Sequence, residues 1–213
     1  MIDPLQLIII MTGAALFPFL AVVATCFIKL SVVFFLVRHA IGVQNIPPNM
    51  ALNALAIILS GYIMAPVVVH THDILVSGHY QYDTIDGLRD AYEAAKGPMI
   101  DFLNKHAADR EKTFFLQAAR ELWPDDMSSS LDLQSLAVVL PSFTVTQLRE
   151  AFEIGFLLYL PFIIIDLVVS NILLAMGMMM VSPLTISLPF KLFLFVMIDG
   201  WSRLILGLVV GYA

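Results

Sequence analysis

Residues 160–183 read LPFIIIDLVVSNILLAMGMMMVSP, and this stretch decides the fold. It has one charged residue, Asp166, and it exceeds the ~20 apolar residues that a helix needs to cross a bilayer. The whole chain of 213 residues has the same character, with 60% hydrophobic residues, 13% charged residues and a mean hydropathy of +0.89. An ordinary soluble domain is about one quarter charged. We therefore predict an all-α integral membrane protein.

Four apolar stretches indicate four spans, joined into bent helical hairpins. They cover residues 5–28, with a continuation to 37, then 50–69, 151–180 and 184–213. Pro47 and Pro48 predict a tight connector, after which Asn49 is a candidate cap for the next helix. Thr144 and Gln147 have the spacing of a capping box, which predicts that the third long helix begins there. Pro161 is a candidate kink in that helix.

A polar insert separates the two hairpins. We divide the chain into a hydrophobic hairpin at 1–69, an insert at 70–143, and a second hairpin at 144–213 with a methionine-rich loop. Within the insert, the spacing of apolar residues predicts helices over 87–96 and 98–122, and turn residues predict loops over 78–86 and 124–130. The insert is acidic overall, which argues against nucleic-acid binding.

The basic residues of the apolar stretches predict the orientation. Lys29 and Arg38 precede the first connector and Lys191 follows the last one, so we expect both connectors in the cytoplasm and the insert outside. No Lys or Arg precedes Lys29, so we expect no cleaved leader. The single cysteine, Cys26, excludes an intrachain disulfide.

Two long motifs resemble the signature of the FliP/SctR family, which includes proteins named YscR and SpaP. They are the run 160–183 and the run SLPFKLFLFVMIDGW at 187–201, supported by the PPN at 47–49. These are core export-apparatus proteins of type III secretion systems. The N-terminus is more similar to the virulence-type injectisome branch, SctR, than to the flagellar branch.

The resemblance implies a subunit of an export gate in the basal body, in the bacterial inner membrane, with the insert on the periplasmic side. Five copies would assemble with SctS and SctT homologues, and then with SctU and SctV homologues, into a ring-like helical pore. The pore would be a sealed conduit for unfolded secreted proteins, in contact with membrane lipid. The resemblance implies neither a cofactor nor an enzymatic activity.

A methionine cluster is the most informative candidate site, formed by Met176, Met178, Met179 and Met180 around Gly177. Methionine is apolar and adaptable, and its commonest role is to fill space between helices. The resemblance implies a different role, in which Met178, Met179 and Met180 form a gasket that closes the pore. Met176 and Gly177 would support it, because glycine adopts backbone angles that methionine avoids.

Asp166 is a costly carboxylate within an apolar helix, so it should face protein or water. A stripe from Gly155 through Tyr159, Phe162 and Asp166 to Gly177 predicts a face toward a neighbouring subunit or the pore. Structural ion pairing is the favoured role for the charges of the apolar parts. They are Lys29, Arg38, Asp166, Lys191, Asp199 and Arg203.

Two sharper alternatives use Asp166. It could serve a stand-alone ion-coupled carrier as a proton relay, or it could act with Asp199 in an intramembrane hydrolase. Two aspartates without a shared site are a weak signal for catalysis.

Gly207 and Gly211 form a Gly-x-x-x-Gly pair that predicts close helix packing. Four histidines of the insert are candidate metal ligands: His70, His72, His79 and His106. No acidic or cysteine residue at a suitable spacing completes a metal site, so we interpret them as surface histidines.

Overall fold

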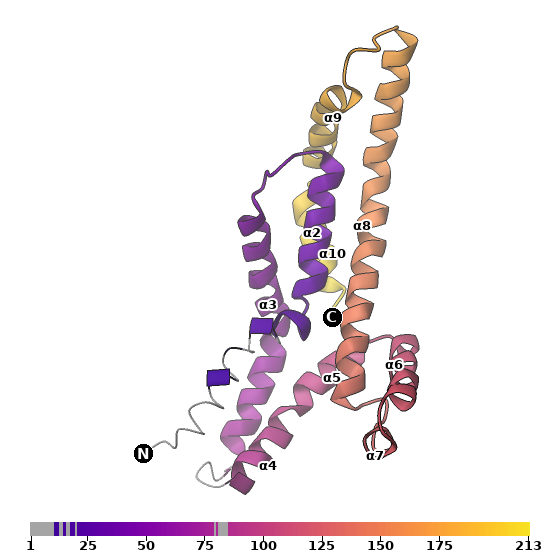
Figure 1. Ribbon diagram of the computed structural model, residues 1–213. Helices are drawn as coiled ribbons and strands as arrows, with labels where there is room; N and C mark the ends of the chain where they lie inside the picture. The colour runs from indigo at the N-terminus through magenta and orange to yellow at the C-terminus, as the bar shows by residue number, and fades with distance from the viewer. Residues whose placement is uncertain (1–10, 13–14, 16–17, 20, 79, 81–84) are drawn as a thin grey trace. The chain divides into compact units, whose positions relative to one another are not determined.

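Helices make up all regular structure in the part of the chain that is described. The computed structural model describes residues 11–12, 15, 18–19, 21–78, 80 and 85–213 (Figure 1). Its helices are α2 Phe27–Ile41, α3 Asn49–Ser77, α4 Ile85–Ala95, α5 Gly97–His106, α6 Asp109–Leu122, α7 Asp125–Ser128, α8 Leu136–Ala175, α9 Pro183–Met197 and α10 Gly200–Val210. The prediction of an all-α chain is confirmed for these residues.

The chain forms two compact units. One, here called the hairpin unit, consists of residues 29–59 and 148–213, and the other, the insert unit, consists of residues up to 28 together with 60–147. Helices α3 and α8 each contribute to both units. The division into 1–69, 70–143 and 144–213 follows chain order and remains a prediction.

Two helices of the described chain, α3 and α8, are long and apolar enough to cross a membrane. Helices α9 and α10 reach that length only together, and they are bent by 58°. The predicted span at 184–213 is therefore bent, and the bend lies at Asp199, which has a left-handed backbone with φ 53°. Eleven of the 24 residues in the predicted span at 5–28 lie outside the described residues.

Helix α3 ends later than predicted, and helix α8 both begins and ends earlier. Helix α3 continues to Ser77, because residues 70–77 contain no Gly or Pro. Helix α8 begins at Leu136, where Asp132 accepts hydrogen bonds from the Ser135 hydroxyl and the Gln134 amide. These bonds, above all the one from Ser135, hold the pKa of Asp132 below its usual value.

Two predicted caps are wrong. The Thr144 hydroxyl lies within α8 and donates to the Leu140 carbonyl four residues earlier, so Thr144 and Gln147 do not open the helix. The Asn49 side chain accepts from Arg38 at 2.7 Å, and the Pro48 carbonyl accepts from the backbone amides of Ala51 and Leu52. Helix α8 continues through Pro161 without a break in its helical assignment.

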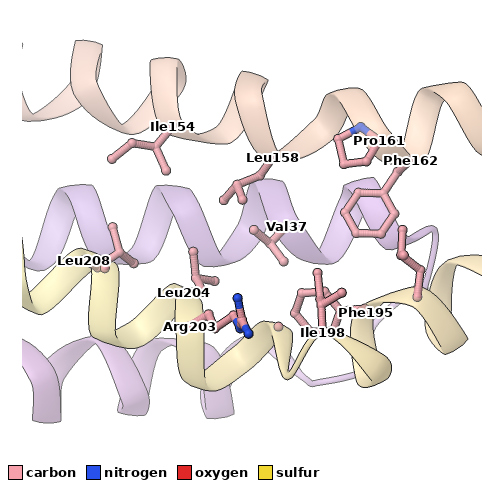
Figure 2. Close-up of a pocket in the computed structure, with 13 residues that line it drawn as sticks. Val37, Ile154, Leu158, Pro161, Phe162, Phe195, Ile198, Arg203, Leu204 and Leu208 are labelled. Atoms are coloured by element: carbon pink, nitrogen blue, oxygen red, sulfur yellow. The ribbon is translucent and has the colours of Figure 1, made fainter.

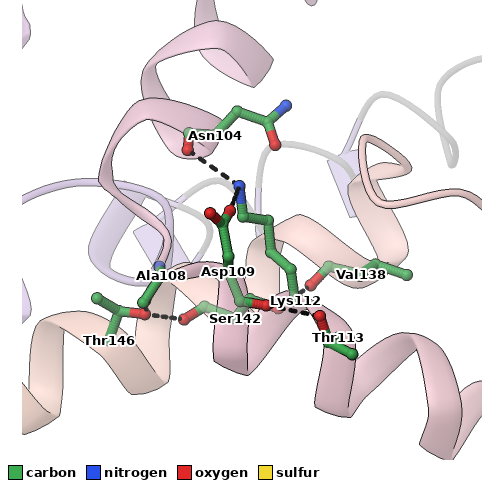
Figure 3. A network of polar contacts seen from close by, with 8 residues as sticks. All are labelled: Asn104, Ala108, Asp109, Lys112, Thr113, Val138, Ser142 and Thr146. Carbon is green, nitrogen blue, oxygen red and sulfur yellow. Dashed lines mark hydrogen bonds and ion pairs between the residues drawn. The ribbon is translucent and has the colours of Figure 1, made fainter.

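Tertiary hydrogen bonds break the predicted helix over 98–122 into α5 and α6. The Thr146 hydroxyl accepts from the Ala108 amide at 3.0 Å and donates to the Ser142 carbonyl (Figure 3). The Gln147 amide donates to the His106 carbonyl at 3.2 Å. Helix α8 thus satisfies backbone groups that the break at 107–108 leaves open. The predicted loop at 124–130 also contains a short helix, α7.

The core of the insert unit lies beside this break. It contains buried side chains from α5, the break, α8 and the segment before α2: Leu103, Ala107, Val139, Phe143 and Ala24. Lys112, on α6, donates to Asp109 at 2.9 Å and to the Asn104 carbonyl at 3.4 Å, which ties α6 to α5 (Figure 3).

Helix α2 lies at the centre of the hairpin unit. Leu30, Val33 and Phe34 are fully buried on it, and Phe34 meets Trp201 of α10 edge to face. Gly155 of α8 permits the close approach of α2, because a Cβ there would lie 2.2 Å from the Leu36 Cδ1 atom. The Leu36 Cβ would lie 3.1 Å away as well, so a residue larger than glycine requires either the Leu36 side chain or the helix spacing to shift.

Replacing Gly155 with alanine should therefore destabilise the protein. The added methyl group overlaps Leu36, and overpacking of this kind costs about 1–3 kcal/mol. Gly61→Ala is the matched control, since a Cβ there meets nothing within 4 Å and alanine favours a helix. We expect thermal unfolding in detergent to show a lower Tm for Gly155→Ala alone. Equal Tm values for the two variants would contradict this packing.

Candidate functional site

Asp166 is held by two groups of α9. One carboxylate oxygen accepts from the Ser187 hydroxyl at 2.6 Å, and the other accepts from the Lys191 ammonium at 2.6 Å. The Lys191 side chain is 4% exposed and that of Asp166 is 27% exposed. Of the partners open to Asp166, the structure selects Lys191.

Helix geometry brings Ser187 and Lys191 together. They are four residues apart on α9 and so share one face, which turns toward α8. Lys191 also donates to the Ala40 carbonyl at the end of α2, at 3.4 Å. One buried ammonium therefore links α8, α9 and α2. Ser187 was not among the predicted site residues, although its spacing from Lys191 places both on one helix face.

A second ion pair lies in the same unit. The Lys29 ammonium is 2.7 Å from Glu150, and it lies 4.5 Å from the centre of the Tyr212 ring. This contact joins the start of α2 to α8 and to the C-terminal residues. Glu150 was not recognised as a partner, because it precedes the residues predicted to be apolar.

Arg38 stabilises the connector between α2 and α3. Its guanidinium donates to the Pro47 carbonyl at 3.0 Å and to the Asn49 side chain at 2.7 Å. It also lies over the Phe35 ring. Arg38 is 5% exposed, so its guanidinium stabilises this turn and is not available to other molecules.

Three residues of the stripe through Asp166 are covered by their own chain, whereas Tyr159 of the same stripe is 36% exposed. Gly155 contacts Leu36, Phe162 packs against Phe195, and Asp166 pairs with Lys191, all within the hairpin unit. The prediction that this face meets a neighbouring subunit or the pore is wrong for these three residues, because α2 and α9 of the same chain cover them. The opposite face of α8 is exposed and apolar, at Phe156, Leu157, Ile164 and Leu167.

The methionine cluster lies in the connection from α8 to α9. The Met178 amide donates to the Leu173 carbonyl and the Gly177 amide to the Leu174 carbonyl, which is the Schellman pattern of a helix end. Gly177 has φ +71°, as this pattern requires. Met176, Met178, Met179 and Met180 are 67%, 40%, 82% and 101% exposed. The chain thus presents four thioethers on a well-defined turn.

The two candidate catalytic aspartates have separate partners. Asp199 precedes α10 and accepts from the Ser202 hydroxyl at 3.0 Å, whereas Asp166 is bound to Ser187 and Lys191. The described residues therefore do not bring Asp166 and Asp199 together as the catalytic pair that a hydrolase would need. The proton-relay role of a carrier is not favoured either, because Asp166 already forms an ion pair with Lys191. A cavity of about 500 Å³, lined in part by His39, Asp166 and Lys191, adjoins the pair.

The remaining candidates occupy different places. Gly207 approaches no other side chain, since a Cβ there would meet nothing within 4 Å, and a Cβ at Gly211 would meet only carbonyls of its own helix. Arg203 is exposed on α10. His70 and His72 are exposed, whereas the His106 ring packs at a tilt against Phe102, and His79 lies outside the described residues. Among the described residues, no three His, Cys, Asp or Glu side chains are grouped as metal ligands.

Replacing Asp166 should destabilise the protein more than replacing Lys191. Asp166→Leu leaves a buried ammonium without its anion and should cost about 3–5 kcal/mol, whereas Lys191→Met leaves a partly exposed carboxylate and should cost less. The double variant should recover much of the loss. Glu93→Gln, which breaks the exposed pair with Lys96, is the control and should cost under about 1 kcal/mol. Additive losses in unfolding experiments would refute coupling between the two residues.

Comparison with known proteins agrees with the sequence motifs. The sequence profile of the FliP family matches residues 10–208. The chain is 52% identical over 210 residues to the Yop proteins translocation protein R of Yersinia pestis, covering 99% of this chain and 97% of the relative. It is 46% identical to the hypersensitivity response secretion protein HrcR of Ralstonia nicotianae, covering 97% and 96%. It is 42% identical to the virulence protein YscR of Salmonella typhimurium, covering 99% and 98%. The chain belongs to the FliP family, in the branch of the injectisome proteins.

Proposed function

We propose that this protein is a core subunit of the export gate of a type III secretion system. Several copies, five by resemblance, surround a common axis together with SctS and SctT homologues. SctU and SctV homologues join this core, and unfolded secreted proteins pass through it. The names of the relatives, which refer to translocation, secretion and virulence, support this role.

The exposed methionine turn carries the proposal. Met178, Met179 and Met180 project from a turn that the Gly177 backbone stabilises, and none of the three is buried within its own chain. Such side chains need a partner, and copies of the same turn around an axis can provide one. Thioethers are soft enough to close a ring and to adapt to many passing side chains. Met176 and Gly177 support the gasket.

The apolar surface supports an assembly. Exposed apolar side chains line α3 and the outer face of α8, including Ile57, Ile58, Phe156 and Ile164. Lipid or neighbouring subunits must cover them, because contiguous apolar surface of this kind is unstable in water. We place the protein in the inner membrane, within the basal body, with the insert on the periplasmic side.

The protein performs no bond-breaking chemistry in this account. Its work is steric and hydrophobic, since its helices build a wall and the methionines close the bore. The charges of the hairpin unit serve this wall: Asp166 with Lys191, Lys29 with Glu150, and Arg38 with the connector.

Removing the methionine side chains should open the gate. We expect the combined variant Met178→Ala, Met179→Ala and Met180→Ala to raise the ion conductance of the assembled complex in a planar bilayer, because alanine is too short to fill the bore. The control combines Met50→Ala, Met127→Ala and Met197→Ala, which removes three exposed methionines elsewhere in the chain. Unchanged conductance in the first variant, with the complex intact, would overturn the gasket.

A further inference from the structure

The hairpin unit contains an apolar cavity of about 580 Å³. Helices α2, α8, α9 and α10 line it, and Figure 2 shows their side chains directed into a common space. Its lining includes Ile154, Leu158, Phe162, Phe195, Leu204 and Leu208. The volume is within the range of about 300–1,000 Å³ typical of ligand pockets. Water is poorly stabilised in such a cavity, because few polar groups line it.

One charged residue, Arg203, lies among these apolar side chains (Figure 2). None of the carboxylates that the structure describes pairs with it. An arginine in an apolar segment of a membrane protein is costly unless it finds an anion or water. The cavity thus combines an apolar interior with a cation that lacks an anionic partner in the described chain.

Gly207 keeps part of this cavity open. It lines the space, and a Cβ at this position would meet nothing within 4 Å. A Cβ atom at Gly207 would therefore extend into open space. Gly207 lies one helical turn from Arg203, so the open space and the cation share one face of α10.

We propose that this cavity binds an anionic phospholipid, with an acyl chain along the apolar lining and the phosphate on Arg203. The guanidinium forms paired hydrogen bonds with phosphate oxygens, and the acyl chain fills a volume that water avoids. A phospholipid supplies both groups in one molecule and is present wherever the protein is inserted. This site is separate from the methionine turn, and it does not depend on the gate function.

Trp201 offers a local reporter of occupancy. Its ring meets Phe195, which lines the cavity, at a centroid distance of 5.4 Å. The chain has two tryptophans, and the other, Trp123, is in the insert unit. In a Trp123→Phe background, the fluorescence of Trp201 can be followed in the full chain, extracted with its complex and reconstituted into vesicles. Phospholipids with brominated acyl chains quench tryptophan at short range.

We expect brominated phosphatidylglycerol to quench Trp201 at lower mole fractions than brominated phosphatidylcholine does. The preference should be about fivefold, the effect of one basic residue next to an anionic lipid. Arg203→Gln should abolish this preference while quenching by both lipids remains. Gly207→Leu should reduce quenching by both lipids, because the new side chain occupies the site. Leu206→Phe is the control, since Leu206 is 63% exposed on the same helix and should change neither.

Two results would overturn the proposal. Equal quenching by the two lipids in the Trp123→Phe protein would mean that no anionic phospholipid is selected. Undiminished quenching in Gly207→Leu would mean that the quencher reaches Trp201 from the bulk bilayer. If Gly207→Leu instead dissociates the complex and the two lipids quench equally, a neighbouring subunit occupies the cavity. Bilayer conductance, measured on the same samples, tests the gate separately.

Discussion

The hairpin unit depends on one buried ion pair. Lys191 can be buried in an apolar segment because Asp166 compensates its charge. The Ser187 hydroxyl donates a hydrogen bond to the other oxygen of that carboxylate. The same ammonium reaches the Ala40 carbonyl, so three helices converge on a single group. A pair of this kind is a poor source of net stability compared with apolar packing, but losing either partner leaves a charge uncompensated. It therefore fixes which helix faces meet.

The internal ion pair determines which surface of α8 is left exposed to lipid or to other subunits. Since the polar stripe of α8 is used internally at Gly155, Phe162 and Asp166, the surface that α8 presents outward is apolar. The turn after α8 likewise points its methionines away from the chain's own core. A protomer that satisfies its charges internally and exposes thioethers and aliphatic side chains suits an assembly in which each copy covers the next. Lipid in the Arg203 cavity would supply an anion to a guanidinium that pairs with no described carboxylate.

Local signals in the sequence predicted much of this fold, whereas tertiary signals were missed. Pro183 and the apolar run after it identified the start of α9, and the motif at 160–183 identified the methionine turn, because both depend on neighbouring residues. The break between α5 and α6 was missed because Thr146 and Gln147, about 40 residues later, provide its hydrogen bonds. The pairing of Asp166 with Lys191 could not be predicted from the sequence either. Several basic residues were possible partners, and only the packing of the helices distinguishes them. Gln147 looked like a capping residue, and its amide is used across the insert unit instead.

We propose that copies of this chain gather around a common axis and cover part of one another's apolar surface. The mass of the gently extracted complex, measured by native mass spectrometry, tests this most directly. The account predicts a homo-oligomer, five copies by resemblance, with or without the small partner subunits. A functional protein that remains a solitary protomer after extraction would contradict it, and it would favour a stand-alone carrier.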